Sequence, residues 1–493
     1  MTDRRADTGG HAVGEQSVPA THHGGEELRR ALGLRTVVST STVLAFAAVE
    51  YLAAAGLVVY VAGDSAWIAI GVAGLLALLA WGFFGELNAM FPTAAAIRLY
   101  MKRSMNDRSA LTITFTYMTT IVLVIAADAF IVGTALTHAF SEPSWVAALW
   151  ILGLLGAAVA SNLRGVRIAG GLQDVATYLV LAATLVVGVA ALAKSHHALR
   201  FPLSPLHGHS PASFIEAVAL GVFLFSAFEW VTTSAEEVRH PAHIHRGMLI
   251  AIGALFVVTS LVATSMSHVL DHQQLKSAYP QLLLGRAAFG QAGLWLMAVV
   301  TAMTALNTFN GGFITASRFV YGTAREGSLP RQLAALNDRA VPWVPVVGLG
   351  ALSLAVALVV ALTHSWQVLV AVGAGLEAMI YAVAALCTLR LRRRAPEHPR
   401  PFRVRGIAVL GVAGLVIFSV LALVASLSVD GSFNPAPLII IAVCAAISAS
   451  YVLFVLPKVQ AAEARRRAAT GRRRPPRAVP VDPGTGDVPP AGA

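Results

Sequence analysis

Long apolar runs separated by short polar segments make up most of the chain. Twelve such runs occur, and most approach the roughly 20 residues that a membrane-spanning helix needs. Gly63-Asp64, Pro330 and Pro435 are among the turn-forming positions that divide them. The pattern therefore predicts twelve transmembrane helices. The runs are 37–62, 66–90, 110–138, 145–162, 170–193, 212–236, 247–269, 291–317, 343–362, 366–389, 407–428 and 436–457.

The composition agrees with a polytopic membrane protein. Of the 493 residues, 56% are hydrophobic and 12% are charged, against about 45–50% and about 25% in an ordinary soluble domain. The net charge of +11 comes from basic residues between the apolar runs and in the tails, so we expect a lipid bilayer and no nucleic acid as partner. Cys387 and Cys444 lie inside apolar runs without the spacing of a metal site. We therefore expect no metal and no cofactor.

The distribution of Lys and Arg predicts the orientation. With a cytoplasmic N-terminus, all but four of the 36 basic residues lie on the cytoplasmic side, which places both termini there. We expect residues 1–28 to form a disordered cytoplasmic tail and 29–458 a transmembrane domain in the cell (inner or plasma) membrane. Residues 459–493 are expected to be a basic, then Pro/Gly-rich, disordered cytoplasmic tail. The four exceptions are Lys194, Arg200, Lys276 and Arg286.

Four acidic residues, and no Lys or Arg, lie deep within the predicted spans: Glu50, Asp128, Glu229 and Glu377. Internal salt bridges cannot neutralise such groups, so each must be protonated, hydrated or paired with a cation from outside. The pattern favours a cationic cargo or a transported proton. A carboxylate that bridges two helices is the structural alternative for Glu229.

Other polar residues in the apolar runs are expected to be structural. Glu86, Asp174 and Glu216 lie nearer helix ends, where water or a helix N-terminus can satisfy a carboxylate. Asn307 and Asn310 are expected to bridge helices by hydrogen bonds, which are useful where lipid offers no partner.

Four segments in collinear order resemble the amino acid–polyamine–organocation (APC) superfamily. The resemblance covers nearly all of the chain outside the tails. It implies an all-α polytopic membrane protein of twelve transmembrane helices, built from two inverted five-helix repeats plus two helices, with the first and sixth helices broken. The segments are GELNAMFPTAAAIRLYM at 85–101, NLRGVRIAGGLQ at 162–173, AFEWVTTSAEEVRHP at 227–241 and LNTFNGGFITASRFVYGTAREGSLP at 306–330.

The resemblance also implies a substrate site at the two broken helices, where freed backbone groups and helix dipoles face the cargo. We expect the sixth helix to break near Ser226 to Glu229. The chain departs from the family in having no glycine between Leu34 and Gly56, and in having Ala227 where a glycine is usual, which disfavours the usual binding of a substrate carboxylate. The expected substrate-binding residues are Ala47, Ala48, Val49, Glu50, Tyr51, Phe225, Ser226, Ala227, Phe228 and Glu229.

Coupling is expected to run through carboxylates. Some members of the superfamily carry a fifth-helix lysine that stands in for a sodium ion, and the segment 174–192 has none. Protons are therefore the expected coupling ion, with sodium as the alternative. Glu50 and Glu229 are the first candidates, followed by Asp128 and Glu377, for which capping or bridging of helices is an equal alternative.

We therefore predict a secondary active transporter, or permease, that moves amino acids or related organic cations across the cytoplasmic membrane with proton coupling. An amine- or polyamine-specific permease or exchanger is the first alternative, and a non-transporting substrate sensor on the same fold is the second. We do not expect an enzyme, because no nucleophile with its base and no metal cluster is recognisable. Aromatic side chains beside the predicted breaks offer π-faces for an ammonium group: Tyr51, Phe225, Phe228 and Trp230.

Overall fold

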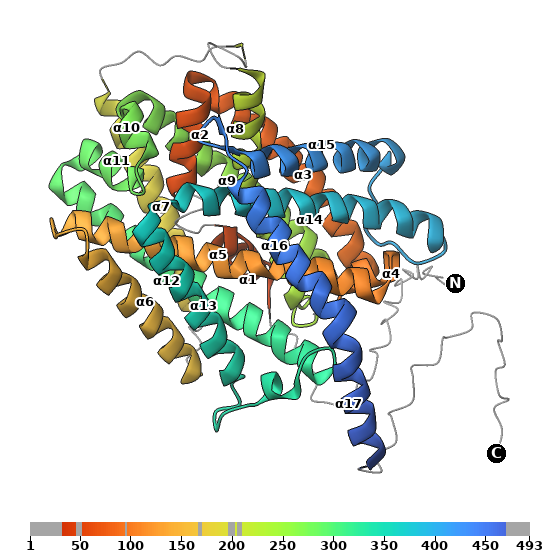
Figure 1. Ribbon diagram of the computed structural model, residues 1–493. Coiled ribbons are helices and arrows are strands. Elements are labelled where there is room, and N and C mark those ends of the chain that lie inside the picture. The colour runs from red at the N-terminus through yellow and green to blue at the C-terminus, as the bar shows by residue number, and fades with distance from the viewer. Residues whose placement is uncertain are drawn as a thin grey trace, which may run out of the picture.

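The computed structural model describes residues 32–45, 52–93, 96–165, 170–195, 203–204 and 210–469. In these ranges the chain is almost entirely helical, with one short hairpin after the helix that ends at Leu427 (Figure 1). The helices are α1 (Leu34–Ala45), α2 (Ala54–Ala62), η2 (Gly63–Ser65), α3 (Ala66–Met90), α4 (Ala96–Ser104), α5 (Asp107–Ala139), α6 (Val146–Leu163), α7 (Gly170–Lys194), α8 (Pro211–Phe223), η3 (Phe228–Ser234), α9 (Ala242–Val269), α10 (His272–Lys276), α11 (Pro280–Phe289), α12 (Gln291–Arg325), η4 (Arg331–Ala334), α13 (Trp343–Thr363), α14 (Trp366–Arg394), α15 (Ile407–Leu427), α16 (Ala436–Ser450), η5 (Tyr451–Val455) and α17 (Leu456–Ala469), and the strands are β1 (Ser428–Val429) and β2 (Ser432–Phe433).

Ten helices among the described residues are long and apolar enough to cross a membrane, and Tyr178–Lys194 is a shorter apolar helix. One of the ten, Ala54–Met90, has 37 residues. A straight helix of that length would extend about 55 Å, nearly twice the thickness of the hydrocarbon core. Gly63, with φ 54° and ψ −136°, leaves the helical region at the start of η2 and divides the segment. The polytopic all-α fold is confirmed, and the count of twelve helices stays a prediction.

One predicted span is interrupted within the described residues. The run at 37–62 is described in two parts, α1, which ends at Ala45, and α2, which begins at Ala54; the predicted binding residues 47–51 lie outside the described residues, so the predicted break in this run stays a prediction. The run at 212–236 is divided between α8 and η3. Ala227, between the two, is left-handed with φ 65° and ψ 0°. The predicted break near Ser226 to Glu229 is therefore confirmed.

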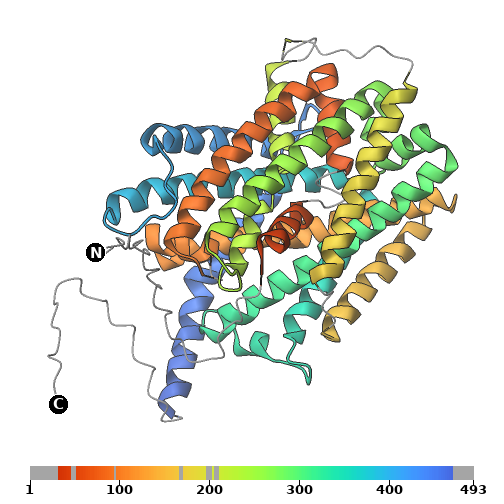
Figure 2. The same ribbon diagram turned by 180° about the vertical axis from the view of Figure 1, so that it is seen from behind.

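The interrupted helix packs at the centre of the bundle. In α5, in the α8–η3 segment and in α14, 83% of the most apolar 18-residue stretch is buried inside the protein. The corresponding share in α6, α13 and α15 is 28%. α14 packs against α3, α5, α8 and α15, and η3 packs against α1 and α9. In Figure 1, α5 and α14 cross the middle of the bundle, and Figure 2 shows the short α1 in the middle of the opposite face. The centre is therefore the place where polar side chains are sealed from lipid.

The outer helices present apolar side chains to the surroundings. Leu352 on α13, Val409 on α15 and Ile447 on α16 are each more than half exposed, as expected for helices that face lipid. The last helix, α17, extends away from the bundle and continues to Ala469 (Figure 1). The first part of the segment 459–493, which the sequence predicted to be a disordered tail, is thus helical. Residues 470–493 and 1–31 lie outside the described residues.

Candidate functional site

The break in the sixth span is made by tight turns after α8. The N–H groups of Phe225 and Ser226 donate to the carbonyl oxygens of Val222 and Phe223, three residues back. The next N–H group to close such a turn belongs to Trp230, which donates to the carbonyl of Ala227. The chain therefore leaves α8 through short turns, passes through the left-handed Ala227 and continues in η3, and this is how Glu229 reaches the bundle centre.

A buried polar cluster surrounds Glu229 and joins three elements. Trp230 Nε1–H on η3 donates to Tyr117 Oη on α5 over 2.6 Å. The same Tyr117 oxygen lies 2.9 Å from Glu229 Oε1 and 3.1 Å from Glu377 Oε2, on α14. The hydroxyl of Tyr381, one turn after Glu377, donates to Glu229 Oε2 over 3.3 Å. We call these five residues, Tyr117, Glu229, Trp230, Glu377 and Tyr381, the acid–tyrosine cluster.

Aromatic rings close the cluster off from solvent. Phe228 packs against the rings of Phe84 and Tyr381, with centroids 6.4 Å and 5.9 Å away. Tyr117, Glu229 and Tyr381 have no exposed surface. A cargo can reach these groups only after helices move, as alternating access requires.

No Lys, Arg or His side chain pairs with Glu229 in the part of the chain that the structure describes. Its partners are the hydroxyls of Tyr117 and Tyr381, its own backbone N–H and the carboxyl group of Glu377. A buried carboxylate satisfied only by neutral donors keeps its charge uncompensated, which is costly in a membrane interior. The arrangement is therefore able to take up a proton or a cationic group.

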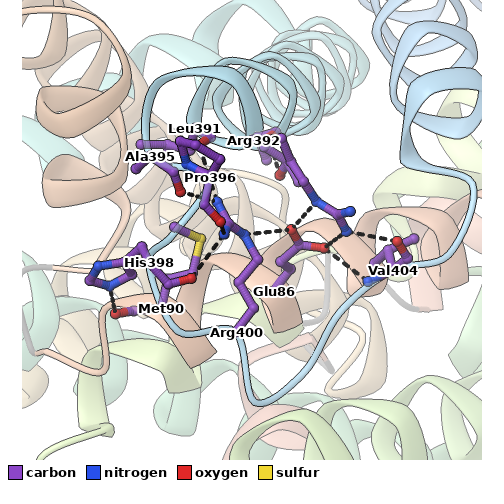
Figure 3. A network of polar contacts seen from close by, with 11 residues as sticks. Glu86, Met90, Leu391, Arg392, Ala395, Pro396, His398, Arg400 and Val404 are labelled. Atoms are coloured by element: carbon purple, nitrogen blue, oxygen red, sulfur yellow. Dashed lines mark hydrogen bonds and ion pairs between the residues drawn. The ribbon is translucent and has the colours of Figure 1, made fainter.

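Glu86 shows the opposite arrangement, in which arginines compensate a buried carboxylate (Figure 3). Arg392 Nε–H and Nη2–H donate to its two oxygens, each over 2.6 Å. The N–H of Val404 donates over 2.9 Å, and Arg400 Nε lies 3.6 Å away. Burial lowers the pKa of the Arg400 guanidinium, and Glu86 opposes this effect. These contacts fasten the 395–406 loop to α3, so Glu86 has the structural role that the sequence predicted.

The structure brings together only some of the predicted site residues. Phe228 and Glu229 belong to the cluster or touch it, whereas Phe225 packs on Phe256 of α9, away from the two acids. The hydroxyl of Ser226 is fully buried and makes no hydrogen bond among the described residues. Ala227 supplies the left-handed turn that separates α8 from η3.

The two weaker coupling candidates differ in position. Glu377 shares Tyr117 with Glu229 and so belongs to the cluster. Asp128 is fully buried on α5, three turns or about 16 Å beyond Tyr117. It is not among the hydrogen-bonded members of the cluster, although it has a polar interaction of its own.

Three residues of the cluster were missing from the predicted site: Tyr117, Trp230 and Tyr381. The spacing of Glu377 and Tyr381, one helical turn apart in an apolar run, is a signal that places both on one helix face. Trp230 directly follows the predicted break, where the sequence predicts only an aromatic face for an ammonium group. Tyr117 carries no such signal, because only the packing of α5 against α14 brings it to Glu229.

Two structural predictions can be compared directly with the contacts. Asn162 Nδ2–H on α6 donates to Asn310 Oδ1 on α12 over 2.8 Å, so Asn310 bridges helices as expected. Glu216 accepts the N–H of Gly431 over 3.1 Å, near the N-terminus of α8. Both side chains have local partners away from the acid–tyrosine cluster.

The fold and the buried site together define a multi-pass membrane transporter. A family model described as amino acid permease matches residues 32–460. The chain therefore belongs to the amino acid permease family, which confirms the resemblance seen in the sequence.

The relatives are transporters and not enzymes. The gamma-aminobutyric acid permease of Bacillus subtilis (strain 168) is 23% identical over 438 residues, covering 82% of this chain and 89% of the relative. The Asc-type amino acid transporter 1 of Homo sapiens is 28% identical over 272 residues, covering 53% of this chain and 50% of the relative. A crystal structure of the Eremococcus coleocola manganese transporter has a TM-score of 0.57 and 16% identity, covering 90% of this chain and 97% of that one. This last likeness supports the fold alone.

Proposed function

We propose that the chain is a secondary transporter that moves amino acids or related organic cations across the cytoplasmic membrane, coupled to protons. The observation that carries this proposal is the buried Glu229 carboxylate at the helix break, which no basic side chain of the described residues neutralises. Because a carboxylate at mid-membrane is costly, a positively charged amino group is the complementary cargo.

The surroundings of Glu229 suit an amino group. The buried hydroxyl of Ser226, which has no hydrogen-bond partner among the described residues, lies at the same break and offers a further hydrogen-bonding group. Phe228 and Trp230 supply aromatic faces, which attract ammonium groups. The names of both relatives refer to amino compounds, in agreement with this class of cargo.

The proposed cycle exchanges charges at the two broken helices. The ammonium group of the cargo docks at the break beside Glu229. Glu50, the acid of the first predicted break, also contacts the ammonium group; this residue lies outside the described ranges. Glu229 or Glu50 takes up a proton when the cargo leaves, as the bundle changes between outward- and inward-facing forms. The distribution of Lys and Arg supports cytoplasmic termini.

Uptake by the purified protein in proteoliposomes tests the assignment. With an inward proton gradient, wild-type protein should accumulate a radiolabelled amino acid or amine. Glu229→Gln should bind this cargo about 10- to 100-fold more weakly, because a charge-assisted hydrogen bond is lost. Glu216→Gln is the matched control, since Gln retains the oxygen that accepts the Gly431 N–H, and it should transport normally.

Competition distinguishes the classes of cargo. If decarboxylated amines compete with the labelled cargo and Glu50→Gln abolishes uptake, the site recognises the ammonium group alone. If only intact amino acids compete and Glu50→Gln transports fully, the role given to Glu50 is wrong. Full uptake by Glu229→Gln would contradict the proposed function itself.

A further inference from the structure

The hydroxyl of Tyr117 lies between two buried acids and one indole donor. Its oxygen lies 2.6 Å from Trp230 Nε1, 2.9 Å from Glu229 Oε1 and 3.1 Å from Glu377 Oε2. All these groups are buried. The side-chain hydrogen atoms available for the three contacts can be counted.

Tyrosine has one O–H hydrogen to donate, and the indole N–H of Trp230 is a donor only. The indole hydrogen points at the Tyr117 oxygen, and the phenolic hydrogen serves one of the two carboxyl groups. One phenolic hydrogen shared between two ionised carboxylates would leave two negative charges around a single buried oxygen, and two carboxyl groups that share a buried site do not both ionise. At least one of the two acids therefore carries a proton.

The contacts of Glu229 indicate which acid is ionised. Both of its oxygens accept tyrosine hydroxyls, from Tyr117 and Tyr381, and its own backbone N–H is a third donor. Several donors stabilise the charged form of a carboxyl group. Glu377 then holds the proton and donates it to Tyr117 Oη. In the resulting chain, Glu377 donates to Tyr117 and Tyr117 donates to Glu229, while the carboxyl group of Glu377 also adjoins Glu229 and Tyr381 directly.

We propose that Glu229 and Glu377 hold a single proton between them and that Tyr117 is the positioning residue that links the acid on α14 to the acid at the helix break. The proton moves from Glu377 Oε2 to Tyr117 Oη while the phenolic proton moves from Tyr117 Oη to Glu229 Oε1. The net result is the transfer of one proton from α14 to the broken helix, and Tyr117 is unchanged. The proton count rests on the geometry and burial of the two acids, and its use in transport rests on the proposed function.

Within the described ranges, the titratable side chains that contact the pair are Tyr117 from α5 and Tyr381 from α14. The neighbouring aromatic groups from α3, η3 and α15 do not titrate: Phe84, Phe228 and Phe418 pack on Tyr381, and Trp230 packs on Tyr117. On α1, Arg35 lies over Tyr178 of α7, and on α9, His245 stacks on Phe402. Among the described residues, neither basic group is a hydrogen-bond partner of the two acids.

Infrared spectroscopy of the protein in lipid at neutral pH, without cargo, tests the proton count. The infrared spectrum of Glu377→Gln should lack one protonated-carboxyl band that is present in the wild-type spectrum. The band should shift in Tyr117→Phe, because its hydrogen-bond acceptor is lost. Tyr100→Phe is the matched control: Tyr100 is also fully buried, but its hydroxyl donates to Asn88 over 3.4 Å, outside the cluster. This control should leave the band in place.

Transport then tests what the proton does. Glutamine at position 377 still donates a hydrogen to Tyr117 but cannot release a proton. Glu377→Gln should keep cargo exchange without a gradient and lose gradient-driven accumulation. Tyr117→Phe should move the midpoint of the pH profile of exchange by about one unit, a tenfold change in proton affinity, while Tyr100→Phe should not.

The outcomes separate the two proposals. Loss of a carboxylate band in Glu377→Gln overturns the assignment of the proton to Glu377, and two ionised or two protonated acids overturn the single shared proton. Gradient-driven accumulation by Glu377→Gln overturns the role of this acid in coupling. If wild-type protein transports none of the tested amines, the proposed function fails while the infrared result still decides the proton count.

Discussion

Ala227 adopts a backbone conformation that is unfavourable for any residue with a Cβ atom. Its φ of 65° and ψ of 0° lie in the left-handed region, which costs an L-residue roughly 1–2 kcal/mol. The strain is located between α8 and η3, where the chain must leave a helix to bring Glu229 to the centre. One residue therefore maintains the geometry of the break, even though it makes none of the polar contacts of the cluster.

Replacing this alanine by glycine should relieve the strain. Ala227→Gly should raise the free energy of unfolding by roughly 0.5–1 kcal/mol, since the gain in the folded state exceeds the entropy added to the unfolded chain. Thermal unfolding in detergent measures the difference. Ala219→Gly, inside α8, should do the opposite and lower stability by about 0.5–1 kcal/mol. If Ala227→Gly unfolded at a lower temperature than the wild-type protein, the proposed backbone strain at Ala227 would be wrong.

At the scale of elements, the loop after α14 is held in place by one buried carboxylate. Glu86 on α3 binds Arg392 at the end of α14, and the nearby Arg400 donates to the carbonyl oxygens of Leu391 and Ala395 in the last turn (Figure 3). The carbonyl groups at a helix C-terminus need such donors. Glu86 therefore positions a guanidinium group beside the end of a central helix.

Removal of the Glu86 carboxylate should leave two partly buried guanidinium groups uncompensated. We expect Glu86→Ala to lower the free energy of unfolding by about 3–5 kcal/mol, as for other broken buried ion pairs. Glu326→Ala provides the comparison, because Glu326 is 57% exposed in its pair with Arg98 and such pairs contribute about 1 kcal/mol or less. Equal effects of both changes on chemical denaturation would argue against the structural role of Glu86.

At the scale of the whole molecule, a small polar contact joins segments that are far apart in the chain. Lys276 on α10 donates to Asp430 in the β1–β2 turn, with Nζ 2.8 Å from Oδ2, and its Nζ lies 5.3 Å from the ring centre of Tyr60 on α2. Gly431, in the same turn, donates to Glu216 on α8. The hairpin thus connects α8, the first part of the interrupted sixth span, to α10 and, through Lys276, to α2.

This connection should weaken at high pH. The hydrogen bond to Asp430 raises the pKa of Lys276, so the stabilisation is complete below the ordinary lysine pKa of about 10.4 and is lost as the pH rises through the higher folded-state value. Between pH 9 and 12, the free energy of unfolding should fall further in the wild-type protein than in Lys276→Met. The difference should be less than about 1 kcal/mol, because the lysine is 39% exposed. Identical pH dependence of thermal unfolding in the two proteins would exclude this contribution.

The sequence predicted the components of the site better than their arrangement. It placed Glu229 and Glu377 deep in apolar runs and predicted the break before Glu229. It gave no means of learning that Glu229 and Glu377 share Tyr117, because these three residues lie on different elements and hydropathy does not report which helix faces meet. Phe225 illustrates the same limit: it adjoins the break in sequence, yet its ring faces α9.

The amino-acid sequence by itself determined that this is a polytopic helical membrane protein with an acidic interior, while the broken sixth span was implied by the resemblance of its motif to the family. The reason is that lipid forces every backbone polar group to be satisfied within its own segment, so apolar runs can be recognised one helix at a time. Only the tertiary structure decided that α5, η3 and α14 meet at one tyrosine and that Glu86, unlike Glu229, has arginine partners. Those outcomes depend on side-chain packing between distant segments, which determines whether a buried carboxylate meets a cation, a hydroxyl or another acid.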